Sequence, residues 1–176
     1  EKRLFLIYTT LDASDNIADK ITDIGLSGIV FVSNVVQKHI EYAVSQKIPC
    51  VLVNSYSDKL PSVLSDNRKG AYLAGRYLIE HGHKTVALLA GVRSYLSNQE
   101  RTAGFLQAFQ EEGLSIPPEL ILETGSWLYD AAEKVCLNFF NTYTGEMPTA
   151  LFAFNDRLAT GASMPSAKPV VLYLTM

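Results

Sequence analysis

Cysteine is scarce in this sequence of 176 residues, which contains only two, Cys50 and Cys136. Two cysteines this far apart cannot form the dense disulfide framework of a small secreted domain, so a reducing compartment, the cytoplasm, is expected. The sequence also lacks a large excess of positive or negative charge. It has 15 Lys and Arg and 18 Asp and Glu, which gives a net charge of -3. We therefore expect no basic surface of the kind that binds nucleic acid directly.

Long apolar runs are also missing. No stretch approaches the roughly 20 apolar residues of a membrane-spanning helix, and the run 4–8 is too short for a secretory signal. We therefore expect no association with a membrane. The sequence does contain 48% hydrophobic and 19% charged residues. This composition is typical of a globular chain that buries a core.

The motifs of common α/β enzymes are not found. The sequence has no G-x-G-x-x-G, no G-x-x-x-x-G-K-[ST] and no G-x-S-x-G motif. His81 and His83 could in principle meet at a metal, but both stand at the end of a predicted helix, where the helix dipole favours histidine. His39 has no acidic or cysteine partner at metal-ligand spacing. We expect no metal site, no cofactor and no enzymatic activity.

Short apolar runs alternate with helical patterns along the chain. The apolar runs are continuous, which is typical of strands buried on both faces of a parallel sheet. The alternation predicts an α/β fold with right-handed crossovers. Strands are predicted at 4–8, 28–32, 50–53, 85–89, 120–122, 150–154 and 169–174, and helices at 12–24, 36–45, 69–80, 99–112, 129–140 and from 155–156 onward.

Ligands of parallel α/β sheets bind outside the carboxyl ends of the strands, and several polar or aromatic residues follow the predicted strands. In the pairs 66–67 and 155–156, one member is expected to cap the next helix, and the other remains available for a ligand. Arg101, near a helix start, opposes the helix dipole, which either a ligand or a salt bridge to an acid such as Glu100 would explain. Trp127 either packs on a sugar ring or fills a gap between helix and sheet.

Six segments together resemble the lactose-repressor (LacI/GalR) family in order and spacing. They are VLSDNRKGAYLA at 63–74, YLIEHGH at 77–83, VALLAG at 86–91, ERTAGF at 100–105, EGL at 112–114 and AFNDRLATGA at 153–162. Residues 25–32 and 48–53 fit the preceding portion, so the resemblance covers most of 1–162. It implies the periplasmic-binding-protein type I fold, in which two α/β subdomains with parallel sheets flanked by helices enclose a ligand cleft.

The resemblance also implies, by motif position, a ligand site of five residues. Arg101 would clamp ligand hydroxyls or a carboxylate, Asn155 would bond a ring hydroxyl, and Trp127 would lie against the ligand. Ser97, in the loop before Arg101, and Asn54, after the third apolar strand, would complete the cleft.

The sequence departs from the family pattern at both ends. The family's helix-turn-helix and its first core strand and helix have no counterpart, and two prolines interrupt the helix expected after residue 162. We therefore expect a truncated core, with residues 1–64 as part of the first subdomain, 65–162 as most of the second, and 163–176 as a tail that does not match. Asp156 is expected to cap the last helix.

The function that the resemblance implies is the effector-sensing core of a LacI-type transcriptional regulator, a cytoplasmic protein that responds to a sugar-like small molecule. In the family, a homodimer binds operator DNA through the helix-turn-helix, so this chain alone is not expected to bind an operator. The alternative is a transport-type or stand-alone sugar-binding protein of the same fold. The alternative would require a signal peptide, which the sequence does not show.

Overall fold

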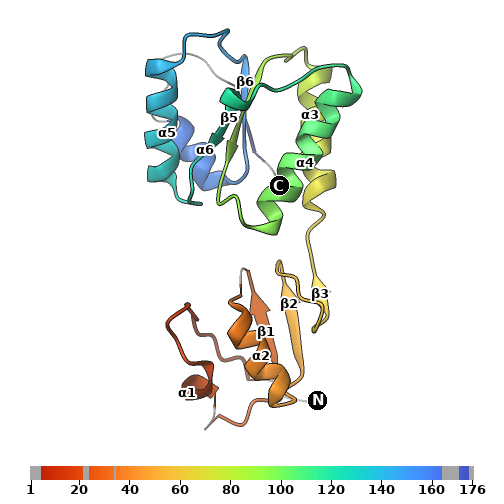
Figure 1. The fold of residues 1–176 in the computed structure, drawn as a ribbon, viewed down its shortest axis with the longest axis vertical. Coiled ribbons are helices and arrows are strands. Elements are labelled where there is room, and N and C mark those ends of the chain that lie inside the picture. Colours follow the sequence, from red (N-terminus) through yellow and green to blue (C-terminus); the bar gives the residue numbers. More distant parts are fainter. Residues whose placement is uncertain (1–4, 22–23, 34, 164–170, 175–176) are drawn as a thin grey trace. The chain divides into compact units, whose positions relative to one another are not determined.

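The computed structural model describes residues 5–21, 24–33 and 35–163, and the backbone of 171–174. The chain divides into two compact units, Glu1–Ser65 and Asp66–Met176, and each is described by itself (Figure 1). Among the described residues, no helix combines the length and the apolar character that crossing a membrane requires.

The N-terminal unit is a small parallel sheet with two helices. Its strands are β1 (Ile29–Val32), β2 (Cys50–Val53) and β3 (Ser62–Val63), in the order β1-β2-β3, and its helices are α1 (Ile17–Ile21) and α2 (Gln37–Ser45). The register pairs Phe31 with Leu52, so both side chains lie on the same face of the sheet. There they form a core with Ile17 of α1 and with Ile40 and Ala43 of α2.

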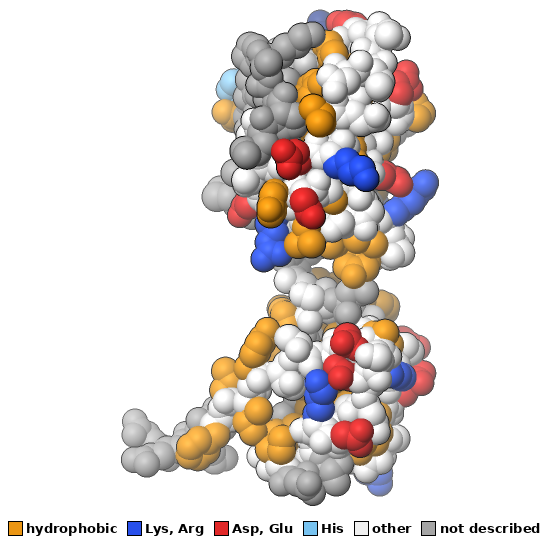
Figure 2. Space-filling model, turned by 90° about the vertical axis from the view of Figure 1, so that its left-hand side faces the viewer, with side chains coloured by type: hydrophobic (Ala, Val, Ile, Leu, Met, Phe, Trp, Pro, Cys, Tyr) orange, Lys and Arg blue, Asp and Glu red, His pale blue; other side chains and the backbone are white. Residues whose placement is uncertain are grey.

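The opposite face of this sheet is largely exposed. Val30, Val32 and Val63 expose 59%, 63% and 61% of their surface, because side chains alternate along a strand and these three point away from the helices. Figure 2 shows hydrophobic side chains gathered along one flank of this unit. The prediction that both faces are buried is therefore wrong for this sheet, since α1 and α2 pack on the same face.

The predicted strand at 4–8 is also wrong for the residues that are described. Residues 5–8 form no strand, and Phe5 and Leu6 expose 91% and 92% of their surface. An apolar run becomes a strand only when another strand supplies backbone hydrogen bonds, and none of the strands in the described part of the chain pairs with this segment.

The C-terminal unit is a four-stranded parallel sheet with helices on both faces. Figure 1 shows α3 and α4 on one side of the sheet and α5 and α6 on the other. The strand order is β5-β4-β6-β7, which confirms the predicted parallel α/β architecture, including a closing strand. The elements are α3 (Asn67–Glu80), β4 (Val86–Ala90), α4 (Leu96–Glu111), a 3-10 turn (Pro118–Leu120), β5 (Ile121–Glu123), α5 (Tyr129–Thr142), β6 (Ala150–Ala153), α6 (Asp156–Ser163) and β7 (Val171–Leu174).

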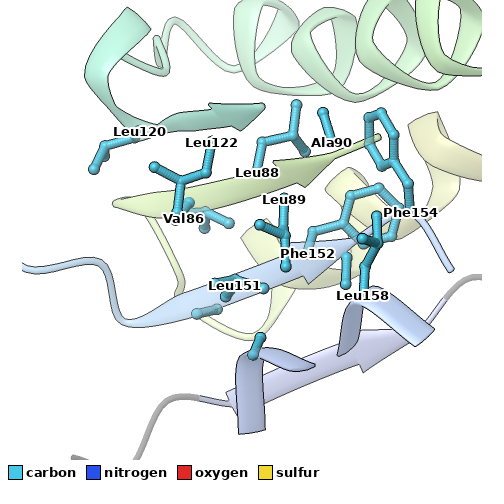
Figure 3. Packing of buried hydrophobic residues seen from close by; sticks show 14 of the residues in the cluster. Val86, Leu88, Leu89, Ala90, Leu120, Leu122, Leu151, Phe152, Phe154 and Leu158 are labelled. Carbon is cyan, nitrogen blue, oxygen red and sulfur yellow. The ribbon is translucent and has the colours of Figure 1, made fainter. Parts of the chain in front are cut away.

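The core of this unit lies between the central strands and the helices on either side. Every residue of β4 and β6 is buried, and Figure 3 shows their side chains packed with Leu120, Leu122 and Leu158. The rings of Phe105 and Phe152 stack with centroids 4.7 Å apart, which joins α4 to β6.

Two helices begin three or more residues away from their predicted starts. The helix predicted at 12–24 is the single turn α1, because the Asp12 carboxylate accepts the N–H groups of Ser14 and Asp15 and holds this stretch as a loop. Helix α4 begins at Leu96 instead of residue 99, so Ser97 lies in its first turn and not in a loop. The short strand β3 was not predicted. The expected proline interruption of the last helix falls on 164–170, outside the described residues.

Candidate functional site

Four of the five predicted site residues belong to the C-terminal unit. Ser97 and Arg101 lie on α4, which follows β4, while Trp127 follows β5 and Asn155 follows β6. The three strands are parallel neighbours, so these segments emerge at the same edge of the sheet. The fifth residue, Asn54, follows β2 in the N-terminal unit.

Arg101 connects three elements of the C-terminal unit. Its Nε donates a hydrogen bond to Oδ1 of Asn67, the first residue of α3, at 2.9 Å, and its Nη1 donates to the carbonyl oxygen of Phe154, just after β6. Phe154 is itself held by a hydrogen bond from its N–H to the carbonyl of Leu89 in β4, at 3.1 Å. The guanidinium is thus fixed to the edge of the sheet.

The charge of Arg101 has no acidic partner among the described residues. None of the salt bridges found there includes Arg101, and the carboxylate of Glu100 accepts a hydrogen bond from Asn67 Nδ2 at 3.3 Å instead. Burial lowers the pKa of the Arg101 guanidinium, but an arginine remains protonated at neutral pH. The site therefore contains a partly buried cation whose second terminal nitrogen, Nη2, forms no hydrogen bond within the described chain.

Asn155 caps α6. Its Oδ1 accepts the N–H of Leu158 at 2.8 Å, and its Nδ2 donates to the carbonyl of Trp127 at 3.4 Å. The prediction that Asp156 is the cap is wrong, because α6 begins at Asp156, and a cap stands before the first helical residue. In the other pair, Asp66 caps α3 by accepting the N–H of Lys69 at 3.0 Å. One member of each pair caps a helix, as predicted.

Trp127 closes the same edge of the sheet from the side of β5. A Cβ atom added to Gly91 would lie 2.6 Å from the indole, so the ring packs directly on the backbone that follows β4. Tyr95 lies beside the indole, with ring centroids 6.1 Å apart. The indole is only partly buried. One part of Trp127 therefore fills the gap between loop and sheet, and the rest of the side chain is exposed.

Ser97 and Asn54 have contrasting surroundings. Ser97 is partly buried and forms no side-chain hydrogen bond within the described residues. Asn54 is exposed, has the left-handed φ of 53°, and its Oδ1 accepts hydrogen bonds from the backbone N–H and the hydroxyl of Ser65, at 3.3 and 3.1 Å. Asparagine tolerates this backbone conformation better than most residues. Asn54 therefore fixes the loop that follows β2.

Two asparagines of the C-terminal unit have structural roles that the sequence did not predict. Asn98 is buried, and its Oδ1 accepts the N–H of Gly91 at 2.9 Å, which holds the loop between β4 and α4. For Asn67 the sequence predicts either a capping or a ligand role, and not its hydrogen bond with Arg101. No sequence signal assigns Asn67 to Arg101, because only the structure shows that Asp66 is the member of the pair that caps α3.

Each of the three histidines forms a hydrogen bond with a different partner. His81 Nδ1 lies 2.8 Å from the carbonyl of Tyr77, His83 Nδ1 lies 3.0 Å from the Thr149 hydroxyl, and the buried His39 has Nε2 3.0 Å from the carbonyl of Asp12. Within the described residues, no group of three or more His, Cys, Asp and Glu is placed to hold a metal ion.

A shallow surface hollow of about 300 Å³ lies over α3 and α4, away from the predicted residues. Its polar groups bond to one another, with Tyr72 donating to Glu111 at 2.7 Å and Arg68 to Gln107 at 2.9 Å. It is lined by Asp66, Arg68, Lys69, Tyr72, Gln107 and Glu111.

Comparisons with known proteins agree on one family. Residues 3–169 match the family described as periplasmic binding proteins and sugar binding domain of LacI family. The HTH-type transcriptional repressor PurR of Vibrio parahaemolyticus is 39% identical over 105 residues, which are 60% of this chain and 30% of that protein.

Solved structures of the same family share the fold. A regulatory protein of LacI family from Chloroflexus aggregans aligns with a TM-score of 0.73 and 28% identity over 85% of this chain and 54% of that one. A LacI family transcriptional regulator from Enterococcus faecium with bound ribose aligns with a TM-score of 0.74 and 23% identity, over 90% and 59% of the two chains. The chain spans less than half the length of the curated relatives that it matches.

Proposed function

Because the chain belongs to the family of periplasmic binding proteins and LacI-type sugar-binding domains, we propose that it is the effector-sensing core of a transcriptional regulator. The names of its curated relatives, which are repressors and regulators of transcription, support this proposal over a transport-type sugar-binding protein. Residues 1–64 and 65–162 are assigned to the two subdomains of such a core, and the compact units found here support that assignment.

The observation that carries the proposal is the state of Arg101. A partly buried guanidinium without an acidic partner has N–H groups that a ligand's oxygens can accept, and its partial desolvation strengthens such hydrogen bonds. Two of its nitrogens are anchored within the unit, so the guanidinium meets a ligand in a fixed orientation. Such a group suits a hydroxyl-rich or anionic small molecule, because arginine offers donors in a planar fork.

The proposed site contains Arg101, Asn155, Trp127 and Ser97 of the C-terminal unit. A ligand role for Asn54, which belongs to the N-terminal unit, stays a prediction of the family resemblance. Asn155 keeps a second N–H and a second lone pair for a ring hydroxyl, and the exposed part of Trp127 offers an apolar face to a sugar ring. The bound ribose of the Enterococcus faecium regulator supports a sugar-like effector.

A second subunit and operator DNA are proposed as partners of the whole regulator. We propose a cytoplasmic homodimer that binds operator DNA through a helix-turn-helix, as the relatives' description as HTH-type indicates. The 176 residues alone have a net charge of -3 and are expected not to bind an operator. Sequence-specific operator binding by this polypeptide in a gel-shift assay would contradict that expectation.

Calorimetric titration of the 176-residue chain with D-ribose, D-glucose and adenosine tests the effector site. At least one of these compounds should bind, and Arg101→Ala should weaken that binding at least tenfold. Lys134→Ala removes one exposed positive charge from α5 and serves as the control that should bind like the wild type. Equal affinity in Arg101→Ala would exclude Arg101 from the site, and catalytic turnover of a bound compound would contradict a sensing role.

A further inference from the structure

The start of α3 places one amide side chain between two charged residues of α4. Asn67 Oδ1 accepts from Arg101 Nε at 2.9 Å, and Asn67 Nδ2 donates to Glu100 Oε2 at 3.3 Å. A primary amide has an acceptor and a donor side by side, so it bonds a cation and a carboxylate at the same time. Aspartate would lack the donor, and alanine would lack both groups.

The local fold explains why Asn67 is available for this contact. Asp66 caps α3, so Asn67 is not needed as the cap. A Cβ at Gly104 would collide with the carbonyl oxygen of Arg68, so the missing side chain lets α4 lie directly against the first turn of α3. Glu100 and Arg101 stand one turn before Gly104 and are therefore within reach of Asn67.

The contact has two consequences for Arg101. With Nε held by Asn67 and Nη1 held by the Phe154 carbonyl, the plane of the guanidinium is fixed at two points. The Glu100 carboxylate, the acid next to Arg101 in the sequence, is occupied by the amide of Asn67. Direct pairing with Glu100 would neutralise the cation and fill its free donors.

We propose that Asn67 is a positioning residue of the effector site. It holds the guanidinium plane of Arg101 and keeps Glu100 from pairing with it, so that the charge and the remaining N–H groups face the effector. This inference rests on the proposed function, because ligand binding by Arg101 is part of that proposal.

The positioning itself can be tested without a ligand. In ¹H–¹⁵N spectra of the 176-residue chain, the Nε–H signal of Arg101, identified by its absence in Arg101→Lys, should be protected from solvent exchange. Asn67→Ala should abolish the protection, whereas Asn67→Asp, which keeps an acceptor, should retain it. Asn138→Ala, an exposed asparagine-to-alanine change on α5, is the matched control. Unchanged protection in Asn67→Ala would overturn the inference.

Titration with D-ribose then tests the consequence for binding. Asn67→Ala should weaken binding about tenfold, which corresponds to about 1.4 kcal/mol. Asn67→Asp should also bind more weakly, because its carboxylate neutralises Arg101 although the guanidinium is still held. The losses from Asn67→Ala and Arg101→Lys should be less than additive in the double variant, a coupling that a purely structural role would not produce.

The outcomes separate the two proposals. If the wild type binds D-ribose and Asn67→Ala binds it equally well, only the role of Asn67 is overturned. If the wild type binds none of D-ribose, D-glucose and adenosine, the proposed effector site is contradicted, and the ligand role of Asn67 falls with it. If only D-glucose or adenosine binds, that compound replaces D-ribose in the titrations of the Asn67 variants. Additive losses in the double variant would show that Asn67 acts on stability and not through Arg101.

Discussion

Strands β2 and β6 show how differently the two units use the same kind of sequence. Both are continuously apolar, four residues long and central in a parallel sheet. Every residue of β6 is buried, whereas β2 fully buries only Leu52. The difference lies in the helices, because both faces of the C-terminal sheet are covered and one face of the N-terminal sheet is not. Burial of an apolar strand is therefore a property of its neighbours as much as of its own sequence.

The largest difference between the two units is expected in the unfolding free energy that is lost when a core phenylalanine is truncated. Phe152→Ala removes a ring that contacts Phe105 and Phe154 inside a core closed on both sides, and should cost about 3–5 kcal/mol of unfolding free energy. Phe31→Ala should cost less, because the thinner N-terminal core can relax toward its open face. Hydrogen exchange at β6 and β1 in each variant measures both effects, and a greater loss at Phe31 would reverse the comparison.

Each unit contains one cysteine, Cys50 in the N-terminal unit and Cys136 in the C-terminal unit, and the two thiols should differ in reactivity. Burial raises the pKa of the Cys136 thiol to about 11, and it also raises the pKa of the Cys50 thiol, which is partly exposed. At pH 8 a disulfide reagent should label Cys50 in the folded chain and Cys136 at least tenfold more slowly, because Cys136 is buried and a thiol with a pKa of about 11 is almost entirely protonated at this pH. Equal labelling rates would show that the C-terminal core opens readily.

The same raised pKa makes the C-terminal unit sensitive to alkali. The folded state favours the neutral Cys136 thiol, so its contribution to stability is complete below the ordinary pKa of 9.0 and is lost as the pH rises toward about 11. Cys136→Ala should lose less stability across this range than the wild type, as monitored by denaturant unfolding.

The smallest effect is expected on the open face of the N-terminal sheet. Val32→Thr exchanges a methyl group for a hydroxyl on a side chain that is 63% exposed, and should change the unfolding free energy by less than about 0.5 kcal/mol. On the buried face, Leu52→Thr introduces a hydroxyl and also removes side-chain volume, and should be severely destabilising. A loss above 1 kcal/mol for Val32→Thr would show that this face is covered in solution.

Most strands and helices could be predicted from periodicity, because apolar runs and capping residues act over a few neighbours. Gly82, for example, follows α3 with a φ of +84°, and the N–H of His83 returns to the carbonyl of Leu78 at 3.0 Å, as the glycine signal predicts. The predictions fail where an interaction with a residue distant in the sequence determines the local structure. Residues 5–8 have the composition of a strand but no strand to pair with, and the start of α4 depends on the bond from Gly91 to Asn98.

The candidate site shows the same division. Arg101 and Asn155 could be named from their motifs, because both stand at fixed distances from strands that end at one edge of the sheet. Asn67 could not be assigned to Arg101, since 34 residues separate them and only the close packing of α3 on α4 at Gly104 brings them together.

The sequence by itself determined the α/β alternation, the parallel arrangement of the strands and the family, because these depend on local patterns and on motif spacing. Tertiary structure alone decided which sheet face is covered, which member of each Asx pair caps its helix, and that Arg101 is held by an amide instead of an acid. The physical reason is that burial and hydrogen bonding are satisfied by whichever groups the packed helices bring near, and residue spacing does not specify those groups.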